Sequence, residues 1–144
     1  MRIIIYGDPK AKQSAKFAKI GKFIKSYQPK SVVQNEKNIR AQVLEQLPED
    51  FRPFTENVIV TKLHFVFSPL KGFSKKKIKL IEDGVIVYKN TKPDLTDNLS
   101  KSLFDAMEGI VYDNDSRIVA MDNLKKYYGF RPRIELDISE FPKR

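Results

Sequence analysis

Carboxylates are concentrated in one short segment of a chain that is otherwise strongly basic. Residues 91–109 read TKPDLTDNLSKSLFDAMEG, with Asp94, Asp97 and Lys101 spaced three and four residues apart. At helical spacing these side chains follow one another, about one turn apart, along one face. Two carboxylates one turn apart offer oxygen ligands to one divalent cation, and a nearby lysine can stabilise a phosphoryl transition state. The pattern therefore indicates metal-assisted hydrolysis of a phosphodiester.

The same segment is predicted to form a two-faced helix that begins at Asp94 and ends at Gly109. Asp94 follows a proline, and its carboxylate is expected to cap free amide groups of the first turn. One side of the helix is apolar and suits a core, with Leu95, Leu99, Leu103, Ala106 and Ile110. The other side is polar, with Asp94, Asp97, Asn98, Lys101, Asp105 and Glu108. A second acidic group, YDNDS at 112–116, is expected to fold back beside the start of this helix.

A purely structural role explains part of this charge pattern. Lys101 has an aspartate four residues away on each side, and such pairs stabilise an exposed helix by about 0.2–0.5 kcal/mol each. Asp94 and Asp97 also suit the positive end of the helix dipole. However, carboxylates on a surface that binds phosphates repel nucleic acid unless a cation bridges them. We therefore favour the metal site.

The overall charge indicates a polyanionic partner. The chain has 144 residues, with 27 Lys and Arg against 18 Asp and Glu, a net charge of +9, which favours nucleic acid over a membrane surface. There is no Cys and only one His, which excludes thiolate chemistry and His-rich zinc sites and disfavours a Ser–His mechanism. The apolar run Ile3–Ile5 is too short for a signal peptide or a membrane span. We expect a soluble protein of a reducing compartment that does not associate with membranes.

Two lysine-rich segments with interleaved aromatic residues are candidate nucleic-acid contacts. Lysines neutralise phosphates, and aromatic rings can stack on unpaired bases. The first segment, 10–28, supplies Lys10, Lys12, Lys16, Lys19 and Lys22, with Phe17 and Phe23 between the lysines. The second, 71–79, supplies Lys71, Phe73, Lys75, Lys76 and Lys77. The alternative for each ring is that it anchors its loop to the core.

The remaining elements predict one compact α+β domain over residues 1–144. Runs of β-branched and aromatic residues predict strands at 2–6, 58–67, 85–88, 117–128 and 134–138. The spacing of apolar residues predicts an amphipathic helix at 29–47, which ends before Pro48. Gly21 can turn a hairpin within 10–28, although a loop there is equally consistent with the sequence. His64, inside the strand at 58–67, is interpreted as a partly buried structural residue rather than a ligand.

Residues 92–118, KPDLTDNLSKSLFDAMEGIVYDNDSRI, resemble the RusA family of Holliday-junction resolvases. In that family a (R/K)PDxDNxxK helix is followed by a turn and a D-D-(S/A)-Q-(I/V) segment. The second helix aspartate falls on Asp97, the asparagine on Asn98, the lysine on Lys101 and the late carboxylate on Asp115. The opening IYGDPKAKQS is also similar to the family's first strand and loop. The chain departs from the pattern in having one extra residue between Asp94 and Asp97.

The resemblance implies a mixed β-sheet with two main helices packed on it. It also implies a homodimeric, Mg²⁺-dependent endodeoxyribonuclease, with Mn²⁺ able to replace Mg²⁺. Such an enzyme would resolve four-way DNA junctions by paired symmetric nicks, in recombination and repair, in the cytoplasm of a bacterium and encoded by its chromosome or a prophage. Asp94, Asp97 and Asp115 would be the metal ligands, and Lys101 would orient water or stabilise the transition state.

Two other functions fit the same composition. A non-catalytic, basic protein that binds junctions or RNA would need the lysines and aromatic residues but not the carboxylates. A nuclease with the same chemistry could act on flaps or other branched DNA. These alternatives are separated by asking whether nicking requires Mg²⁺ and the carboxylates, and which branched DNA is cut fastest.

Overall fold

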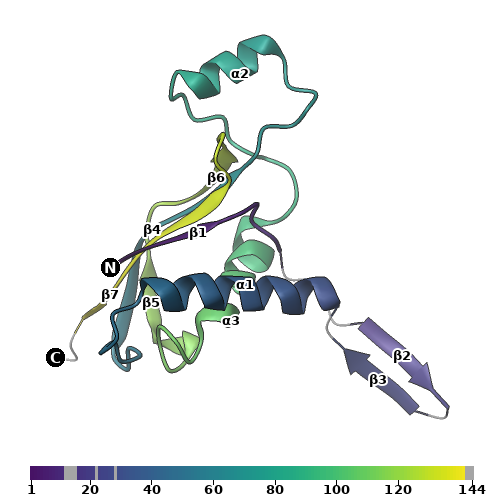
Figure 1. The fold of residues 1–144 in the computed structure, drawn as a ribbon, viewed down its shortest axis with the longest axis vertical. Coiled ribbons are helices and arrows are strands. Elements are labelled where there is room, and N and C mark those ends of the chain that lie inside the picture. Colours follow the sequence, from purple (N-terminus) through teal and green to yellow (C-terminus); the bar gives the residue numbers. More distant parts are fainter. Residues whose placement is uncertain (12–15, 22, 28, 142–144) are drawn as a thin grey trace.

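A five-stranded mixed sheet forms the centre of the computed structural model, which describes residues 1–11, 16–21, 23–27 and 29–141 (Figure 1). The sheet order is β1, β7, β4 and β5, with β6 also paired to β4. β7 pairs antiparallel with both β1 and β4, whereas β5 and β6 run parallel to β4. The strands are β1 (Arg2–Tyr6), β4 (Asn57–Phe67), β5 (Ile118–Met121), β6 (Leu124–Tyr128) and β7 (Arg133–Phe141).

The central strand β4 supplies much of the core through one face. Val58 and Val60 are fully buried, and so are Leu63 and Phe65. Buried and less buried residues alternate up to Val60, whereas all residues of 63–67 are buried. The change occurs where the register with β7 shifts, between Val60 and Lys62.

The opposite face of the sheet is polar and holds the single histidine. His64 is 9% exposed; its Nδ1 lies 3.0 Å from the Tyr127 hydroxyl and its Nε2 3.1 Å from Asn123 Oδ1. Burial lowers the pKa of His64. The interpretation of His64 as a structural residue is consistent with this environment.

Helix α1 (Lys30–Gln46) covers the free edge of β1 with two glutamine side chains. Gln46 accepts from the Ile4 N–H at 2.9 Å and donates to the Ile4 carbonyl at 2.7 Å. Gln42 makes the same pair of bonds with Tyr6, at 2.8 and 3.0 Å. These four bonds satisfy backbone groups that an edge strand leaves open, so they fix α1 against the sheet.

Helix α3 (Ser100–Met107) forms the second part of the acidic segment and packs beside α1. The Asn35 amide donates to the Ser102 hydroxyl at 2.9 Å, and Arg40 Nη1 donates to the Ala106 carbonyl at 3.1 Å. Leu103 is fully buried. α1 therefore sets the position of α3 through polar bonds as well as apolar packing.

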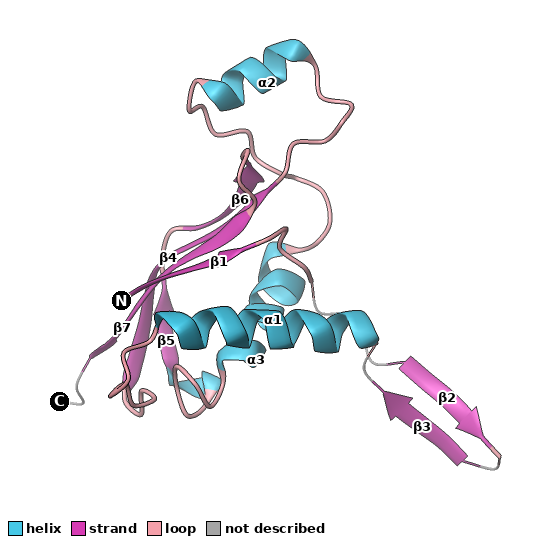
Figure 2. Cartoon of the chain, in the orientation of Figure 1, coloured by secondary structure: helices cyan, strands magenta, loops and turns pink. Residues whose placement is uncertain are grey.

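Two smaller elements extend from this body (Figure 2). The hairpin of β2 (Lys16–Ile20) and β3 (Phe23–Tyr27) leaves from the start of α1, and Gly21 in its turn has φ +60°. Helix α2 (Lys75–Glu82) stands apart from the sheet. Along the chain it follows β4 and precedes the acidic segment. The prediction of a strand at 85–88 is wrong, because this segment forms only an isolated bridge between Tyr88 and Tyr127.

The predicted fold class is confirmed: the structure is a single α+β domain with a mixed sheet on which two helices pack. The hairpin alternative for 10–28 is also confirmed, whereas α2 was not expected. The strand predicted at 117–128 is in fact two strands, separated by Asp122 and Asn123. Within the described ranges, no helix is both long enough and apolar enough to span a bilayer.

Candidate active site

The acidic segment is helical, but its first turn is a π-turn over Leu95–Leu99. The Leu99 N–H donates to the Asp94 carbonyl at 3.0 Å, and the Ser100 N–H donates to the Leu95 carbonyl, so each bond spans five residues. The Ser100 hydroxyl also donates to the Leu95 carbonyl, at 2.7 Å. A π-turn holds one residue more than an α-turn, so it takes up the extra residue that separates Asp94 from Asp97.

Two expectations about this segment were therefore wrong. A spacing of 100° per residue does not apply across the π-turn, so Asp97 is rotated away from the position that a regular helix would give it. Asp94 occupies the N-cap position, but its carboxylate makes no capping hydrogen bond. Both carboxylates are exposed.

The backbone just before Asp94 is held by a lysine of β6. Lys126 Nζ donates to the Thr91 carbonyl at 2.6 Å and to the Pro93 carbonyl at 2.8 Å. The Lys89 N–H in turn donates to the Lys126 carbonyl at 3.1 Å. Lys126 thus ties the approach to the acidic helix directly to the sheet. The sequence contained no signal that separated it from the other surface lysines.

One pocket, of about 390 Å³, joins the acidic helix to the segment that carries Asp115. Its polar lining comes from Thr96, Ser100, Lys101, Asp105 and Asp115. Its apolar lining comes from Phe104, Ile118, Met121 and Leu124. Lys101 and Asp115 therefore line the same pocket. Asp115 shares this pocket with Thr96 of the first turn, while the hydrogen bonds of 112–116 to the helix go to its end, at Phe104 and Glu108. Asp94 and Asp97 are not among the lining residues.

Asp115 is positioned by a loop with many hydrogen bonds. Its backbone N–H donates to Glu108 Oε1 at 3.1 Å, across the end of α3. Two residues earlier, the Asp113 N–H donates to the Phe54 carbonyl at 3.0 Å. The Asp113 carboxylate is bidentate to Arg117 at 2.8 and 2.9 Å, which lowers the pKa of Asp113. Asp113 is thus engaged in an ion pair, while Asp115 faces the pocket.

Three carboxylates act on the buried hydroxyl of Tyr112. This residue is fully buried, and its hydroxyl donates to the Phe104 carbonyl. Burial raises the pKa of Tyr112, and the charges of Asp115, Glu108 and Asp105 raise it further. Asp105 and Glu108 therefore belong to the electrostatic environment of Asp115. The sequence placed both on the polar face of the helix but did not assign them to the site.

The described residues contain no group of three Asp, Glu or His side chains close enough together to bind a metal ion by themselves. This fits one way of binding Mg²⁺, which commonly uses one or two carboxylates together with water and substrate phosphates. The all-oxygen donor set of Asp94, Asp97 and Asp115 suits such an ion. The three aspartates thus have the ligand chemistry for such an ion but do not form a preformed three-acid site, and their role as ligands stays a prediction.

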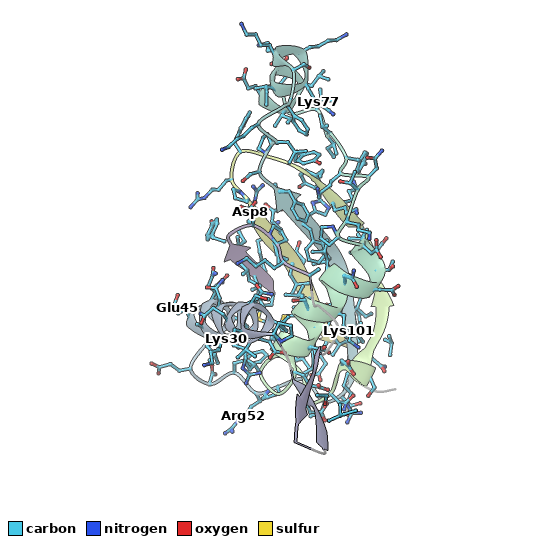
Figure 3. All side chains as sticks on the ribbon, turned by 90° about the vertical axis from the view of Figure 1, so that its right-hand side faces the viewer. Asp8, Lys30, Glu45, Arg52, Lys77 and Lys101 are labelled. Atoms are coloured by element: carbon cyan, nitrogen blue, oxygen red, sulfur yellow. The ribbon has the colours of Figure 1, made fainter. Side chains whose placement is uncertain are left out.

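The second lysine-rich segment lies on α2 and the loop before it, far from the pocket. Figure 3 shows Lys77 at one end of the molecule and Lys101 well away from it. Lys71, Lys75, Lys76 and Lys77 are exposed. Phe73 packs edge-on against Tyr128, with ring centroids 4.7 Å apart, and Lys77 Nζ lies 4.3 Å from the Phe73 ring centroid. This packing favours the anchoring role of the ring over a free stacking role.

The first lysine-rich segment is described only in part. Lys10 is exposed. Lys12 and Lys22 lie outside the described residues, as do the side chains of Lys16, Lys19, Phe17 and Phe23. The roles predicted for these residues remain predictions.

These features define a candidate phosphodiester-cleaving site on an α+β domain. A family model described as endodeoxyribonuclease RusA matches residues 6–139. The chain therefore belongs to the RusA endodeoxyribonuclease family, and the match covers the acidic helix, the pocket and all of the sheet except most of β1 and the end of β7.

A curated relative adds a more local similarity. The chain is 39% identical over 67 residues to the uncharacterized protein YqaN of Bacillus subtilis (strain 168). The alignment covers 46% of this chain and 45% of that protein, so it spans somewhat less than half of each.

Proposed function

We propose that the chain is a Mg²⁺-dependent endodeoxyribonuclease that resolves four-way DNA junctions by paired symmetric nicks. The observation that carries this proposal is the shared pocket of Lys101 and Asp115, within a chain that belongs to the RusA family. A four-way junction with two-fold symmetry is matched by two active sites related by the same axis. The proposal therefore includes a homodimer, acting in bacterial recombination and repair in the cytoplasm.

In this proposal the carboxylates of Asp94, Asp97 and Asp115 hold Mg²⁺, with Mn²⁺ able to replace it. Held by these carboxylates, such an ion would polarise the phosphodiester as a Lewis acid and would lower the pKa of a water. Lys101 lies one turn beyond Asp97, at the pocket wall, where its ammonium group can bind a phosphate oxygen and stabilise the charge that develops there. The hydrogen bond from the Asp115 N–H to Glu108 supports the backbone of Asp115, whose side chain lines the same pocket as Lys101.

The basic surfaces supply binding rather than chemistry. The lysines at 71–77, together with those at 10–22, would neutralise phosphates on the arms of the junction. Lys77 and Lys101 lie in well-separated parts of the molecule (Figure 3), as expected for a substrate much larger than a single nucleotide. Binding energy from these remote contacts can hold the scissile strand at the pocket.

A gel of a synthetic mobile four-way junction, with and without Mg²⁺, tests the proposal. We expect paired nicks in opposed strands with Mg²⁺, little cutting without it, and slower cutting of flaps and linear duplexes. Binding of the junction without nicking under any divalent cation would favour the non-catalytic alternative. Faster cutting of flaps than of junctions would favour a nuclease for other branched DNA.

A further inference from the structure

Half of the pocket next to Lys101 and Asp115 is apolar, and phosphate chemistry does not account for that half. Phe104, Ile118, Met121 and Leu124 line it, in the same pocket as the charged Lys101, Asp105 and Asp115. Contacts to phosphate and sugar use charged and polar groups. A nucleobase is the apolar part of the same nucleic-acid strand that would reach an apolar wall beside these polar contacts.

We infer that this apolar half receives an unpaired nucleobase of the nucleotide next to the scissile phosphate. The inference rests on the proposed function. Ligand sites that combine an apolar wall with a few polar groups typically measure about 300–1,000 Å³, and the volume of this pocket, about 390 Å³, lies within that range. Every base has an apolar face that can pack on Met121, which is 42% exposed, and on the small exposed part of Phe104, which is 8% exposed.

A junction makes such a base available at low cost. Within a duplex, a base must be unpaired and unstacked before it can enter a pocket, which costs a few kcal/mol, and this cost is lowest where pairing is already disturbed. Pairing and stacking are interrupted at the crossover of a four-way junction. The lysines would bind the phosphates of any DNA, and the pocket would add selectivity for branch points.

One exposed residue of the pocket can be enlarged to block entry of a base without changing the charged residues. Met121 is at the end of β5 and 42% exposed, so a larger side chain there can fill the pocket without disturbing the core. Val119 is on the same strand, 59% exposed, and lines a separate hollow with Arg117. Met121→Trp is therefore the blocking variant and Val119→Trp its matched control.

The first experiment measures base capture without catalysis. A four-way junction with 2-aminopurine at the crossover is titrated with the full-length protein in the absence of divalent metal. We expect wild type and Val119→Trp to raise the emission on the order of twofold through unstacking of the base, and Met121→Trp to raise it less. Equal emission with all three proteins, or no rise with wild type, would overturn the inference.

The second experiment uses nicking in Mg²⁺ and a junction with an abasic nucleotide at the same place. On the normal junction, Met121→Trp should nick about 5- to 150-fold more slowly than wild type, the range for losing one stacked base. On the abasic junction this difference should shrink, because no base has to enter the pocket. An equal loss on both junctions would overturn base capture. Absence of nicking by wild type would instead overturn the proposed function, and the emission experiment would still decide the inference.

Discussion

The pocket around Lys101 and the helix α2 are both charged, but they are built differently. Lys101 lies on a helix whose other face includes the fully buried Leu103, and the approach to that helix is fixed by Lys126. α2 stands away from the sheet, and its approach is anchored by the contact of Phe73 with Tyr128. Fixed geometry suits chemistry, in which small displacements are costly, while phosphate neutralisation tolerates mobile cations. We therefore expect substitutions in the pocket to change rates and substitutions on α2 to change affinity.

Asp115→Asn should give a large effect on rate, as expected for the loss of a metal ligand. The substitution keeps the size of the side chain but removes its charge. We expect single-turnover nicking of a four-way junction to fall on the order of 10³-fold. Asp113→Asn is the matched control, because Asp113 is exposed and paired with Arg117. A similar loss in both variants would show that the loop, and not the Asp115 carboxylate, matters.

Exchanging one lysine in each region separates the two roles. Lys101→Met should lower the nicking rate by about 10²–10³-fold, the usual effect of removing a group that stabilises transition-state charge, with little change in junction affinity. Lys77→Met should leave the rate of the bound junction unchanged. The measurement is single-turnover nicking at saturating protein, with affinity determined in parallel. A rate loss from Lys77→Met as large as that from Lys101→Met would contradict the assignment of chemistry to the pocket and of binding to α2.

Lys126 is expected to act as a positioning residue. Lys126→Met removes both bonds to the carbonyls before Asp94, and we expect nicking to fall by about 10- to 100-fold through misplacement. The Mg²⁺ concentration for half-maximal nicking should rise as well, which a loss of global stability alone would not cause. Lys125→Met, on the neighbouring residue of β6, is the control. An unchanged Mg²⁺ requirement would remove Lys126 from the account.

The smallest effect on chemistry should come from α2. Replacing Lys75, Lys76 and Lys77 with Ala should weaken junction binding and reduce the slope of log affinity against log salt by about 0.9 for each phosphate that is no longer neutralised. Nicking of the saturated junction should stay close to wild type. Fluorescence anisotropy over a range of salt concentrations measures the slope. An unchanged slope would show that α2 does not bind phosphate.

The strands and α1 were predictable because their signals are local. The β-branched run of β4 and the apolar spacing of α1 appear directly in the sequence, and the structure follows both. α2 was missed because KKKIKLIE is dominated by charge, which hides its short apolar face. The segment at 85–88 resembles a strand locally, but it forms only an isolated bridge, between Tyr88 and Tyr127, and not a strand.

For the candidate site, local patterns in the sequence singled out Lys101 and Asp115, which line one pocket in the structure. Asp94 and Asp97, singled out by the same patterns, do not line it, and the roles of all four residues stay predictions. The π-turn did not follow from local patterns, because helical periodicity assumes bonds that span four residues, while the bonds to Asp94 and Leu95 span five. The contribution of Lys126 depends on tertiary packing that no local pattern contains.

The most direct test of the central claim is Mg²⁺-dependent nicking by Asp97→Asn, compared with Asp50→Asn. Asp50 is exposed, lies outside the acidic segment and loses the same charge in its variant. On a synthetic four-way junction, we predict that Asp97→Asn binds at least as well as wild type but is nearly inactive, while Asp50→Asn nicks normally. Normal nicking by Asp97→Asn would contradict the assignment of the acidic helix as the metal-binding part of the active site.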